Sequence, residues 1–494
     1  MKNKYDIVVI GSGIGGLVSA ALLSSLGKKI LIIEKEPKPG GYLTEFKNED
    51  FTFDVSLHLL NGCASGHYSH DVFRRCGIID DIKFLSPKHL YRSIFPDYDI
   101  KVPQTDIRAY IDMLAGLFPK SGKGIDALFG EMRAIFDAVN SLRTSGHVSP
   151  VLMRHVAGKF YSIIDKHIDD IRLKAIICQL WVYFGLPPSM LRSIDFSYPC
   201  FDYLNNGGYY LEKGSYEIVR ALVRRIEANG GHLLFNKSVG RISIKDDDYQ
   251  RVSFGKEEVY CDTIISNIDL TKTVYELMGS GRFRADILKR FGNISPSISA
   301  FELFLGLDTD LKERYPDDYE IFVNSGYDLD EQYGDCVQNN AQKAPFVITI
   351  NSNVNRFSAP KGKSVITVIM LAGYKFWSSK SRGEYQDKKD RLADILINRA
   401  SRVIPEIKAR LKKKVVSTPV TFERYTNNSE GAIYGYSRTL GHGGEVRPND
   451  IKNIGSLYFA SAWARQGSGV AKVLYAADDV YKKISEQSFE KIIR

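Results

Sequence analysis

Hydrophobic residues near the start of the chain predict two buried strands joined by a helix. Residues 5–10 (YDIVVI) form an apolar run, which is typical of a buried parallel strand. A stretch rich in Ala, Leu and Ser continues to Gly27, and residues 29–33 give a second apolar strand. The sequence GSGIGG at residues 11–16 lies between the first strand and the helix. This order of strand, glycine-rich turn, helix and strand predicts a dinucleotide-binding unit.

Each glycine of the turn has a separate mechanical role. Gly11 permits the tight turn, Gly13 lets the backbone approach a pyrophosphate, and Gly16 allows the helix to pack closely on the strand. The free N–H groups and the positive dipole end of the helix then face the phosphates. Glu34 ends the second strand and is placed to accept hydrogen bonds from a ribose. The unit therefore predicts cofactor contacts from Gly11, Ser12, Gly13, Ile14, Gly15, Gly16, Glu34 and Lys35.

Later segments predict a second sheet and a discontinuous organisation. Residues 295–307, 346–351 and 364–371 alternate in the manner of strands, and residues 101–204 have a mainly helical pattern. The predicted fold class is α/β. We expect a dinucleotide domain built from residues 1–100, 205–294 and 416–494, a helical subdomain at 101–204, and the sheet of a substrate domain at 295–415.

A second glycine pair indicates which dinucleotide is bound. Gly40 and Gly41 follow closely after Glu34, so a second stretch of backbone can approach the cofactor. A flavin lying along the domain needs this element, whereas a nicotinamide does not. With the FTFD stretch at residues 51–54, this pattern resembles the phytoene desaturase, carotenoid isomerase and retinol saturase family of FAD-dependent flavoproteins. The resemblance implies FAD in a Rossmann-like domain of the GR2 type, with a substrate domain of mixed sheet plus helical insertion.

The end of the chain carries the same resemblance. Residues 455–463 look like the family's last strand before the flavin, and residues 466–470 then begin a helix whose N-terminus would face the flavin. The family more often has Pro-Gly-Gly-Gly-Val-Pro-Gly here. This chain departs from it at Gln466, Ser468 and the pair Ala471-Lys472, and Lys472 either adds positive charge at the flavin or points to solvent. The resemblance adds as cofactor contacts Gly40, Gly41, Tyr42, Val239, Asn267, Ser461, Trp463, Gly467, Gly469 and Val470.

The resemblance also implies the chemistry. An FAD-dependent desaturase, saturase or isomerase exchanges a hydride between the flavin and a carbon of a polyene, carotenoid-like or other lipophilic substrate. If a proton also moves, the candidates are His58, which the saturase-like branch tends to share, and Arg424 or Tyr425, expected on a late substrate strand. The alternative for His58 is a core histidine bonded to a backbone carbonyl. The electron acceptor stays open.

Two other functions are compatible with this fold. An amine-oxidase-like flavoenzyme would act on a smaller metabolite and would surround the flavin with aromatic side chains. A non-redox prenyl-binding protein, as among the Rab GDP-dissociation inhibitors, would hold no flavin.

Composition limits the compartments and the kinds of ligand to be expected. Six cysteines lie far apart, which favours a reduced, cytoplasmic compartment. Cys63, His67 and His70 lack a fourth ligand, so no metal is predicted. The net charge of +9 is spread among acidic residues, without a nucleic-acid signature. Basic and large apolar residues interleave in 101–204, which fits either a solvated helical surface or peripheral contact with a membrane.

Overall fold

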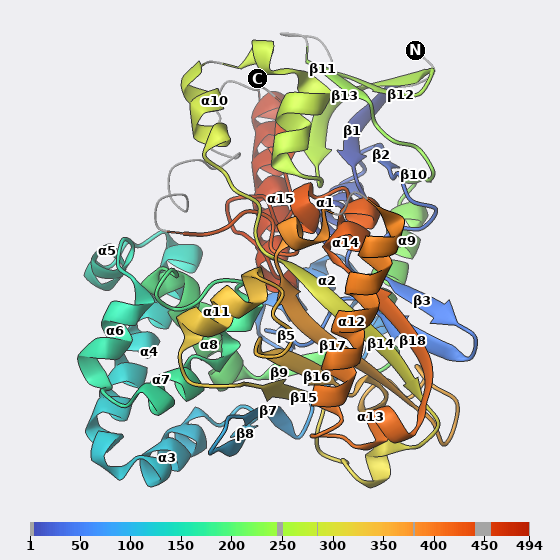
Figure 1. Cartoon of the computed structure of the whole chain (residues 1–494). Helices are drawn as coiled ribbons and strands as arrows, with labels where there is room; N and C mark the ends of the chain where they lie inside the picture. The colour runs from blue at the N-terminus through green and yellow to red at the C-terminus, as the bar shows by residue number, and fades with distance from the viewer. Residues whose placement is uncertain (1–3, 245–249, 284, 379–380, 440–455, 494) are drawn as a thin grey trace.

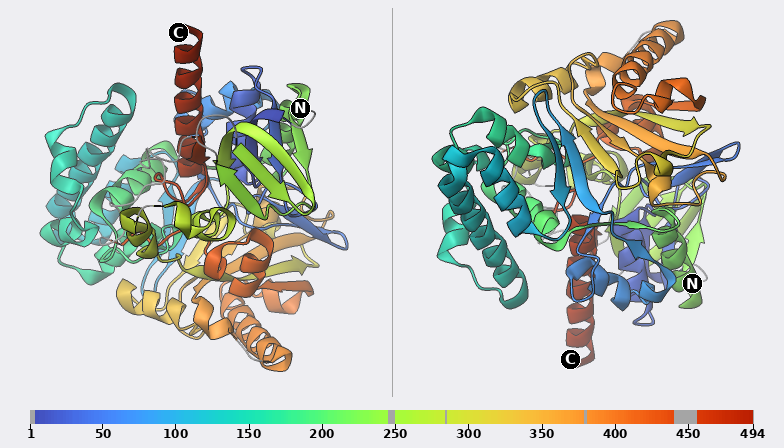
Figure 2. Two further views of the ribbon diagram at one scale, coloured as in Figure 1. Left: turned by 90° about the horizontal axis from the view of Figure 1, so that it is seen from above. Right: turned by 90° about the horizontal axis from the view of Figure 1, so that it is seen from below.

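The computed structural model describes residues 4–244, 250–283, 285–378, 381–439 and 456–493. Two seven-stranded sheets and a helical insertion make up its architecture (Figure 1). In Figure 1 the insertion, coloured teal, lies to one side of the second sheet, and both views of Figure 2 keep it on that side. One continuous hydrophobic core joins the first sheet, the insertion and the second sheet.

The first sheet is the dinucleotide-binding layer. Its strand order is β10-β2-β1-β13-β12-β11, with β19 beside β13. The pairs among β1, β2, β10, β13 and β19 are parallel, whereas β12 pairs antiparallel with β13 and β11. The central strand β1 is buried from Ile7 to Ile10. Such burial on both faces is typical of parallel strands. The strands are β1 (Lys4–Ile10), β2 (Ile30–Ile33), β10 (His232–Leu234), β11 (Arg241–Ile244), β12 (Gln250–Phe254), β13 (Glu257–Ser266) and β19 (Leu457–Phe459).

The second sheet has the order β18-β14-β17-β16-β15-β7-β8 and is antiparallel apart from the β15–β7 pair. Its strands are β7 (His89–Ile94), β8 (Asp99–Pro103), β14 (Ser299–Leu307), β15 (Glu320–Val323), β16 (Phe346–Thr349), β17 (Ser364–Ala372) and β18 (Leu411–Ser417). The sequence analysis expects residues 1–100 in the dinucleotide domain, yet residues 89–103 extend this second sheet. The hydrogen bonds of β7 to β15 are long-range and have no local signal in the sequence.

Short strands connect the two layers. β3 (Glu45–Asn48) pairs with β4 (Phe51–Asp54), while β9 (Gly208–Leu211) pairs with β5 (Leu60–Asn61) and β6 (Phe84–Leu85). Asp54 fixes β4 in place, since its carboxylate accepts hydrogen bonds from Tyr210 Oη at 2.6 Å and Ser215 N at 2.7 Å. The chain segment after the second glycine pair is therefore anchored to residues far along the sequence.

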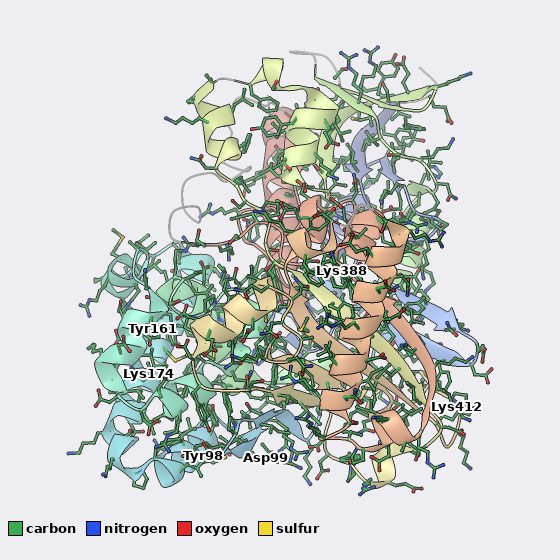
Figure 3. All side chains as sticks on the ribbon, in the orientation of Figure 1. Tyr98, Asp99, Tyr161, Lys174, Lys388 and Lys412 are labelled. Carbon is green, nitrogen blue, oxygen red and sulfur yellow. The ribbon has the colours of Figure 1, made fainter. Side chains whose placement is uncertain are left out.

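Helices cover both layers. The helices outside the insertion are α1 (Ile14–Ser24), α2 (Tyr68–Arg75), α9 (Tyr216–Ala228), α10 (Ala285–Gly292), α11 (Leu329–Val337), α12 (Arg382–Ala400), α13 (Glu406–Ala409), α14 (Pro419–Thr426) and α15 (Val470–Ile493). The insertion consists of α3 (Ile107–Leu117), α4 (Gly122–Ser145), α5 (Pro150–His155), α6 (Phe160–His167), α7 (Ile171–Ile177) and α8 (Ser193–Asn206). Figure 3 shows Tyr161 and Lys174 together on this insertion, where the ammonium lies 5.7 Å from the ring centre.

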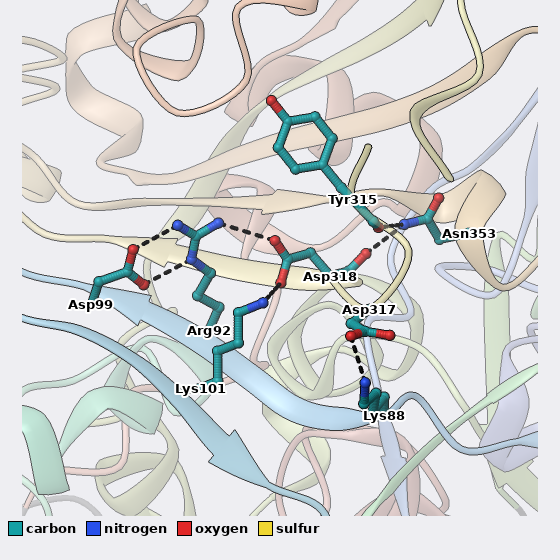
Figure 4. Close-up of polar contacts among 8 residues, drawn as sticks. All are labelled: Lys88, Arg92, Asp99, Lys101, Tyr315, Asp317, Asp318 and Asn353. Atoms are coloured by element: carbon teal, nitrogen blue, oxygen red, sulfur yellow. Dashed lines mark hydrogen bonds and ion pairs between the residues drawn. The ribbon is translucent and has the colours of Figure 1, made fainter. Parts of the chain in front are cut away.

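A charge cluster fixes the outer edge of the second sheet (Figure 4). The guanidinium of Arg92 contacts Asp99 at 2.6 Å and Asp318 at 3.0 Å, and Lys101 reaches Asp318 at 3.2 Å. Two cations thus meet two carboxylates. Asn353 donates to the carbonyl of Asp318 at 2.6 Å and ties the loop before β15 to the same cluster.

Candidate active site

One large cavity runs from the first sheet to the second sheet and the insertion. Its volume is about 2610 Å³, whereas drug-sized ligands commonly occupy pockets of about 300–1,000 Å³. The glycine-rich turn and the start of α15 line one part, and side chains of α4, α8 and the second sheet line another. The cavity therefore has room for a dinucleotide and a second ligand together.

The glycine-rich turn presents bare backbone to this cavity. β1 ends at Ile10, and Gly11 has a φ of +89°, a conformation that favours glycine. A Cβ placed on Gly13 would lie 2.5 Å from Asn267 Nδ2. Gly11, Gly13 and Asn267 all line the cavity. A side chain at position 13 would therefore fill the space in front of the N-terminus of α1.

Gly15 and Gly16 serve packing. A Cβ on Gly15 would lie 1.8 Å from the carbonyl oxygen of Ala460, and one on Gly16 would lie 2.5 Å from the carbonyl oxygen of Gly11. Neither glycine lines the cavity. Their role is to let α1 lie close to β1 and to the chain after β19, as the sequence predicts for Gly16.

Glu34 connects the end of β2 to the turn. Its Oε2 accepts hydrogen bonds from Ser12 N at 2.8 Å and Ser12 Oγ at 2.6 Å, and its Oε1 accepts from Glu36 N at 2.9 Å. The residue lines the cavity, whereas Ser12 lies behind it. A carboxylate has about four acceptor positions, so Glu34 keeps one of them open while it holds the turn.

The second glycine pair lies against the first turn. Gly40 forms an isolated bridge with Gly13, and its N–H donates to Ser12 O at 3.0 Å. A Cβ on Gly41 would lie 3.3 Å from Gly13 Cα. Next to them, Tyr42 Oη donates to Ala432 O at 3.1 Å, and burial raises the pKa of Tyr42 to about 12. Two adjacent stretches without side chains form the cradle that an extended dinucleotide requires.

The end of the chain completes this cradle. After β19 the chain turns through Gly469, which has a φ of +89°, and α15 begins at Val470. Trp463 is buried, and its Nε1 donates to Asn428 Oδ1 at 3.1 Å. The predicted contacts that line the cavity are Gly11, Gly13, Ile14, Glu34, Lys35, Gly40, Gly41, Tyr42, Val239, Asn267, Ser461, Trp463, Gly469 and Val470. The others, Ser12, Gly15, Gly16 and Gly467, lie behind this surface.

His58 belongs to a polar group at the second sheet. Its Nδ1 lies 3.0 Å from Glu320 Oε1 and 3.0 Å from Thr349 Oγ1. Glu320 is buried at the start of β15 and also accepts a hydrogen bond from Tyr183 Oη. Burial, followed by the Glu320 charge, raises the pKa of Tyr183. His58 lines the cavity, so this contact with side chains replaces the backbone carbonyl considered as its alternative partner.

Glu302 is a buried carboxyl in the cavity wall. It lies on β14 with only 1% of its surface exposed, and Oε2 has no hydrogen-bond partner among the described residues. Burial, with a smaller effect from Asp54, raises its pKa well above the usual range. Burial therefore favours the neutral form of this side chain in the apolar surface of the sheet.

Arg424 and Tyr425 do not occupy the expected strand. They lie on α14, which begins with Thr418 as N-cap and Pro419 in the first turn, and Thr418 and Thr421 form a capping box. The carbonyl of Arg424 accepts a hydrogen bond from Lys35 Nζ at 2.7 Å, and Tyr425 is 56% exposed. Both line the cavity beside the first sheet, whereas His58 is held by the second.

Comparison with known proteins agrees with this geometry. The family model of an NAD(P)-binding Rossmann-like domain matches residues 9–76. An all-trans-retinol 13,14-reductase of Danio rerio is 25% identical over 88% of this chain and 78% of its own length. A prolycopene isomerase of an Oncidium hybrid cultivar is 25% identical over 96% of this chain and 82% of its own length. A 4,4'-diapophytoene desaturase of Staphylococcus aureus (strain MRSA252) is 23% identical over 97% of this chain and 99% of its own length.

Over most of its length the chain is thus similar to proteins named as a retinol reductase, a prolycopene isomerase and a diapophytoene desaturase, in agreement with the resemblance that its sequence carries. Solved structures confirm the predicted α/β fold. An oxidoreductase from Methanosarcina mazei has a TM-score of 0.65 at 15% identity and covers 97% of this chain and 100% of its own. A putrescine oxidase has a TM-score of 0.67 at 12% identity, with 98% and 99% covered. These structural likenesses show the shared fold alone.

The sequence analysis missed Glu302 in the cavity wall and Glu320, the partner of His58. Glu302 is a single carboxylate within a largely apolar strand, and that interruption is the signal that would have found it, whereas Glu320 begins β15 directly after other polar residues and has no such signal. Lys472 is partly buried and lines the cavity, so the solvent-facing alternative for it is wrong. Within the described part of the chain, no helix is long and apolar enough to cross a membrane.

Proposed function

We propose that this chain binds FAD and oxidises, reduces or isomerises a lipophilic polyene. Support for FAD comes from the two facing glycine turns, where Gly13 and Gly41 leave the backbone open, and from the acceptor position kept by Glu34. The start of α15 directs its free N–H groups to the same cavity. When bound there, FAD supplies hydride transfer.

The observation that carries the substrate class is the continuity of the cavity. The space beside the dinucleotide cradle extends between α4, α5 and α8 along an apolar wall. That wall includes Phe136, Val139, Leu142, Leu152, Val156 and Ile194. An elongated hydrocarbon fits such a surface, because it gains from burial along its whole length. The relatives named for retinol, prolycopene and diapophytoene support the same class.

His58 moves the proton in this proposal. Glu320 and Thr349 hold its Nδ1, so Nε2 is the atom left for the cavity. The buried side chain of Glu320 orients the ring through this contact. Reduction of a double bond requires a proton from Nε2, and desaturation requires Nε2 to accept one. Glu320 acts through His58 and is a positioning residue.

A contact with lipid at the end of the apolar wall is part of the proposal. Val156 lines the cavity and is 45% exposed, and Val148 and Met153 nearby in the chain are 52% and 65% exposed. Arg154 and Lys159 are also exposed in this segment. Apolar and basic side chains together favour the surface of an anionic membrane, from which a polyene could enter.

The experiment begins with the absorbance spectrum of the purified protein, which should show oxidised flavin. Flavin-loaded protein is then incubated without oxygen with polyenes, carotenoids and amines, while bleaching and the geometric isomers of each polyene are followed. Bleaching or isomerisation by a polyene supports the proposal. Bleaching by an amine alone would show an amine oxidase, and absence of flavin would show a binding protein.

A further inference from the structure

A charged group lies in the cavity wall where α8 meets α15. Asp195, in the first turn of α8, accepts hydrogen bonds from Arg192 Nε at 2.7 Å and Arg438 Nη1 at 3.1 Å. Lys472, in the first turn of α15, lines the same wall, and its ammonium lies 5.8 Å from the centre of the Phe184 ring. Three cationic side chains therefore surround a single carboxylate.

Counted over the residues that the structure describes, this group is short of negative charge. Burial and the nearby Arg438 lower the pKa of Lys472 to about 7, although Asp195 acts in the opposite direction. Arg143 and Arg192 add to the lowering. Among the described residues, none forms an ion pair or hydrogen bond with Lys472, and the buried Nε of Arg438 also has no partner. Buried cations are normally paired.

The other carboxylates that α8 and α15 present to the cavity wall are already engaged. Asp478 pairs with Arg75 at 2.7 Å and with Lys482 at 3.0 Å. Asp202 accepts from the amides of Asn61 and Asn206, and Asp479 accepts from Gln466. None of these contacts reaches Lys472.

The cluster at the outer edge of the second sheet shows the structural alternative. There, Arg92 and Lys101 meet Asp99 and Asp318, and the charges balance (Figure 4). That cluster does not line the large cavity. The unbalanced cluster does line it, which indicates that its missing anion comes from a ligand.

The cluster also lies close to the proposed proton donor. Phe184 is in contact with Lys472, and the preceding residue, Tyr183, has its ring 6.1 Å from the ring of His58. Consecutive residues thus connect the two polar sites. One elongated ligand can reach both, with its apolar chain between them.

We propose that Lys472 and Arg438 bind the carboxylate of the substrate, so that the substrate is a long-chain carboxylic acid. This inference rests on the proposed function for the role of the cavity as substrate site. A single negative charge matches the ammonium of Lys472, which has no ion pair within the described part of the chain, whereas a doubly charged phosphate would call for more free donors. The apolar wall then holds the chain, and Asp195 keeps the two arginines in place.

The test is a binding measurement on the flavin-loaded full-length protein. Dodecanoate and dodecanol are titrated separately by calorimetry, since they differ in charge and share the chain. We expect dodecanoate to bind more tightly. Lys472→Met should lower the affinity for dodecanoate about tenfold or more, as loss of a charged hydrogen bond does. Its affinity for dodecanol should be unchanged. Lys472→Arg should restore binding of the acid.

Proton uptake gives a second readout. At about pH 8, Lys472 with a pKa of about 7 is mostly neutral, and a bound carboxylate raises that pKa. Binding of dodecanoate should therefore take up a proton, which is seen as a dependence of the binding heat on the buffer. The uptake should fade below about pH 7 and vanish in Lys472→Met.

The matched control is Lys482→Met on the same helix, where the lysine already pairs with Asp478. It should bind dodecanoate as the wild type does. Equal affinity of the wild type for acid and alcohol would refute the carboxylate site and leave the proposed function standing. Loss of flavin from Lys472→Met would also refute it, because Lys472 would then hold the cofactor. A wild type without flavin would instead refute the proposed function.

Discussion

The two ends of the large cavity are built in different ways. At the dinucleotide end, backbone atoms of Gly13, Gly40 and Gly41 form the surface, and the key side-chain contact joins Ser12 to Glu34, 22 residues apart. At the substrate end, side chains form the surface. His58 meets Thr349 across 291 residues, and Arg438 meets Asp195 across 243. The first half of a cofactor cradle can thus arise from one local unit, whereas the substrate site needs distant segments brought together throughout.

The most direct test of the dinucleotide end is a substitution at Gly13. Gly13→Val would place a side chain where even a Cβ lies 2.5 Å from Asn267 Nδ2, so we expect loss of FAD from a folded protein. Flavin absorbance after gel filtration measures this. Gly116→Val is the control, because a Cβ at Gly116 meets nothing within 4 Å. A Gly13→Val protein with full flavin would show that this turn does not hold the cofactor.

The same contrast explains what the sequence could predict. The strand β1, the turn, Glu34 and the start of α15 are local patterns whose glycines have few physical roles. The partners of His58 could not be predicted, because β15 and β16 reach it only through sheet pairing. Arg424 and Tyr425, expected on a strand, lie on a helix whose start signal, Thr418 followed by Pro419, is present in the local sequence.

The substrate end is tested by substitution of His58. His58→Gln should retain flavin and lower turnover about 100-fold or more, because a positioned acid or base commonly contributes that much. Glu320→Gln should give a smaller loss together with a shifted pH profile, since it acts through His58. Turnover against pH, with flavin content measured in parallel, checks both. His89→Gln in β7 is the control, and equal losses in all three variants would contradict the proposal.

A smaller effect on FAD binding is expected from substitution of Glu34, which is both the proposed ribose acceptor and a partner of Ser12 in the turn. Glu34→Ala removes the acceptor for a ribose and the bonds to Ser12, so FAD affinity should fall by about 1–3 kcal/mol. The protein without FAD should also lose stability to urea, in contrast to His58→Gln. Glu36→Ala is the control, because it removes only a partly exposed pair with Lys35. Unchanged FAD affinity in Glu34→Ala would exclude the ribose contact.

The smallest effect concerns the outer end of the apolar wall, and it extends the comparison to the molecular surface. If the segment around α5 docks on lipid, the protein should sediment with anionic vesicles and be released as salt rises, because screening weakens the attraction of Arg154 and Lys159. Met153→Asp should lower vesicle binding about fivefold, which corresponds to about 1 kcal/mol. Phe357→Asp is a matched control, since Met153 and Phe357 are both 65% exposed and only Met153 lies in the insertion. An equal loss in both variants would mean that exposed apolar surface in general causes the binding. A loss in Met153→Asp alone would identify α5 as the membrane-facing entrance.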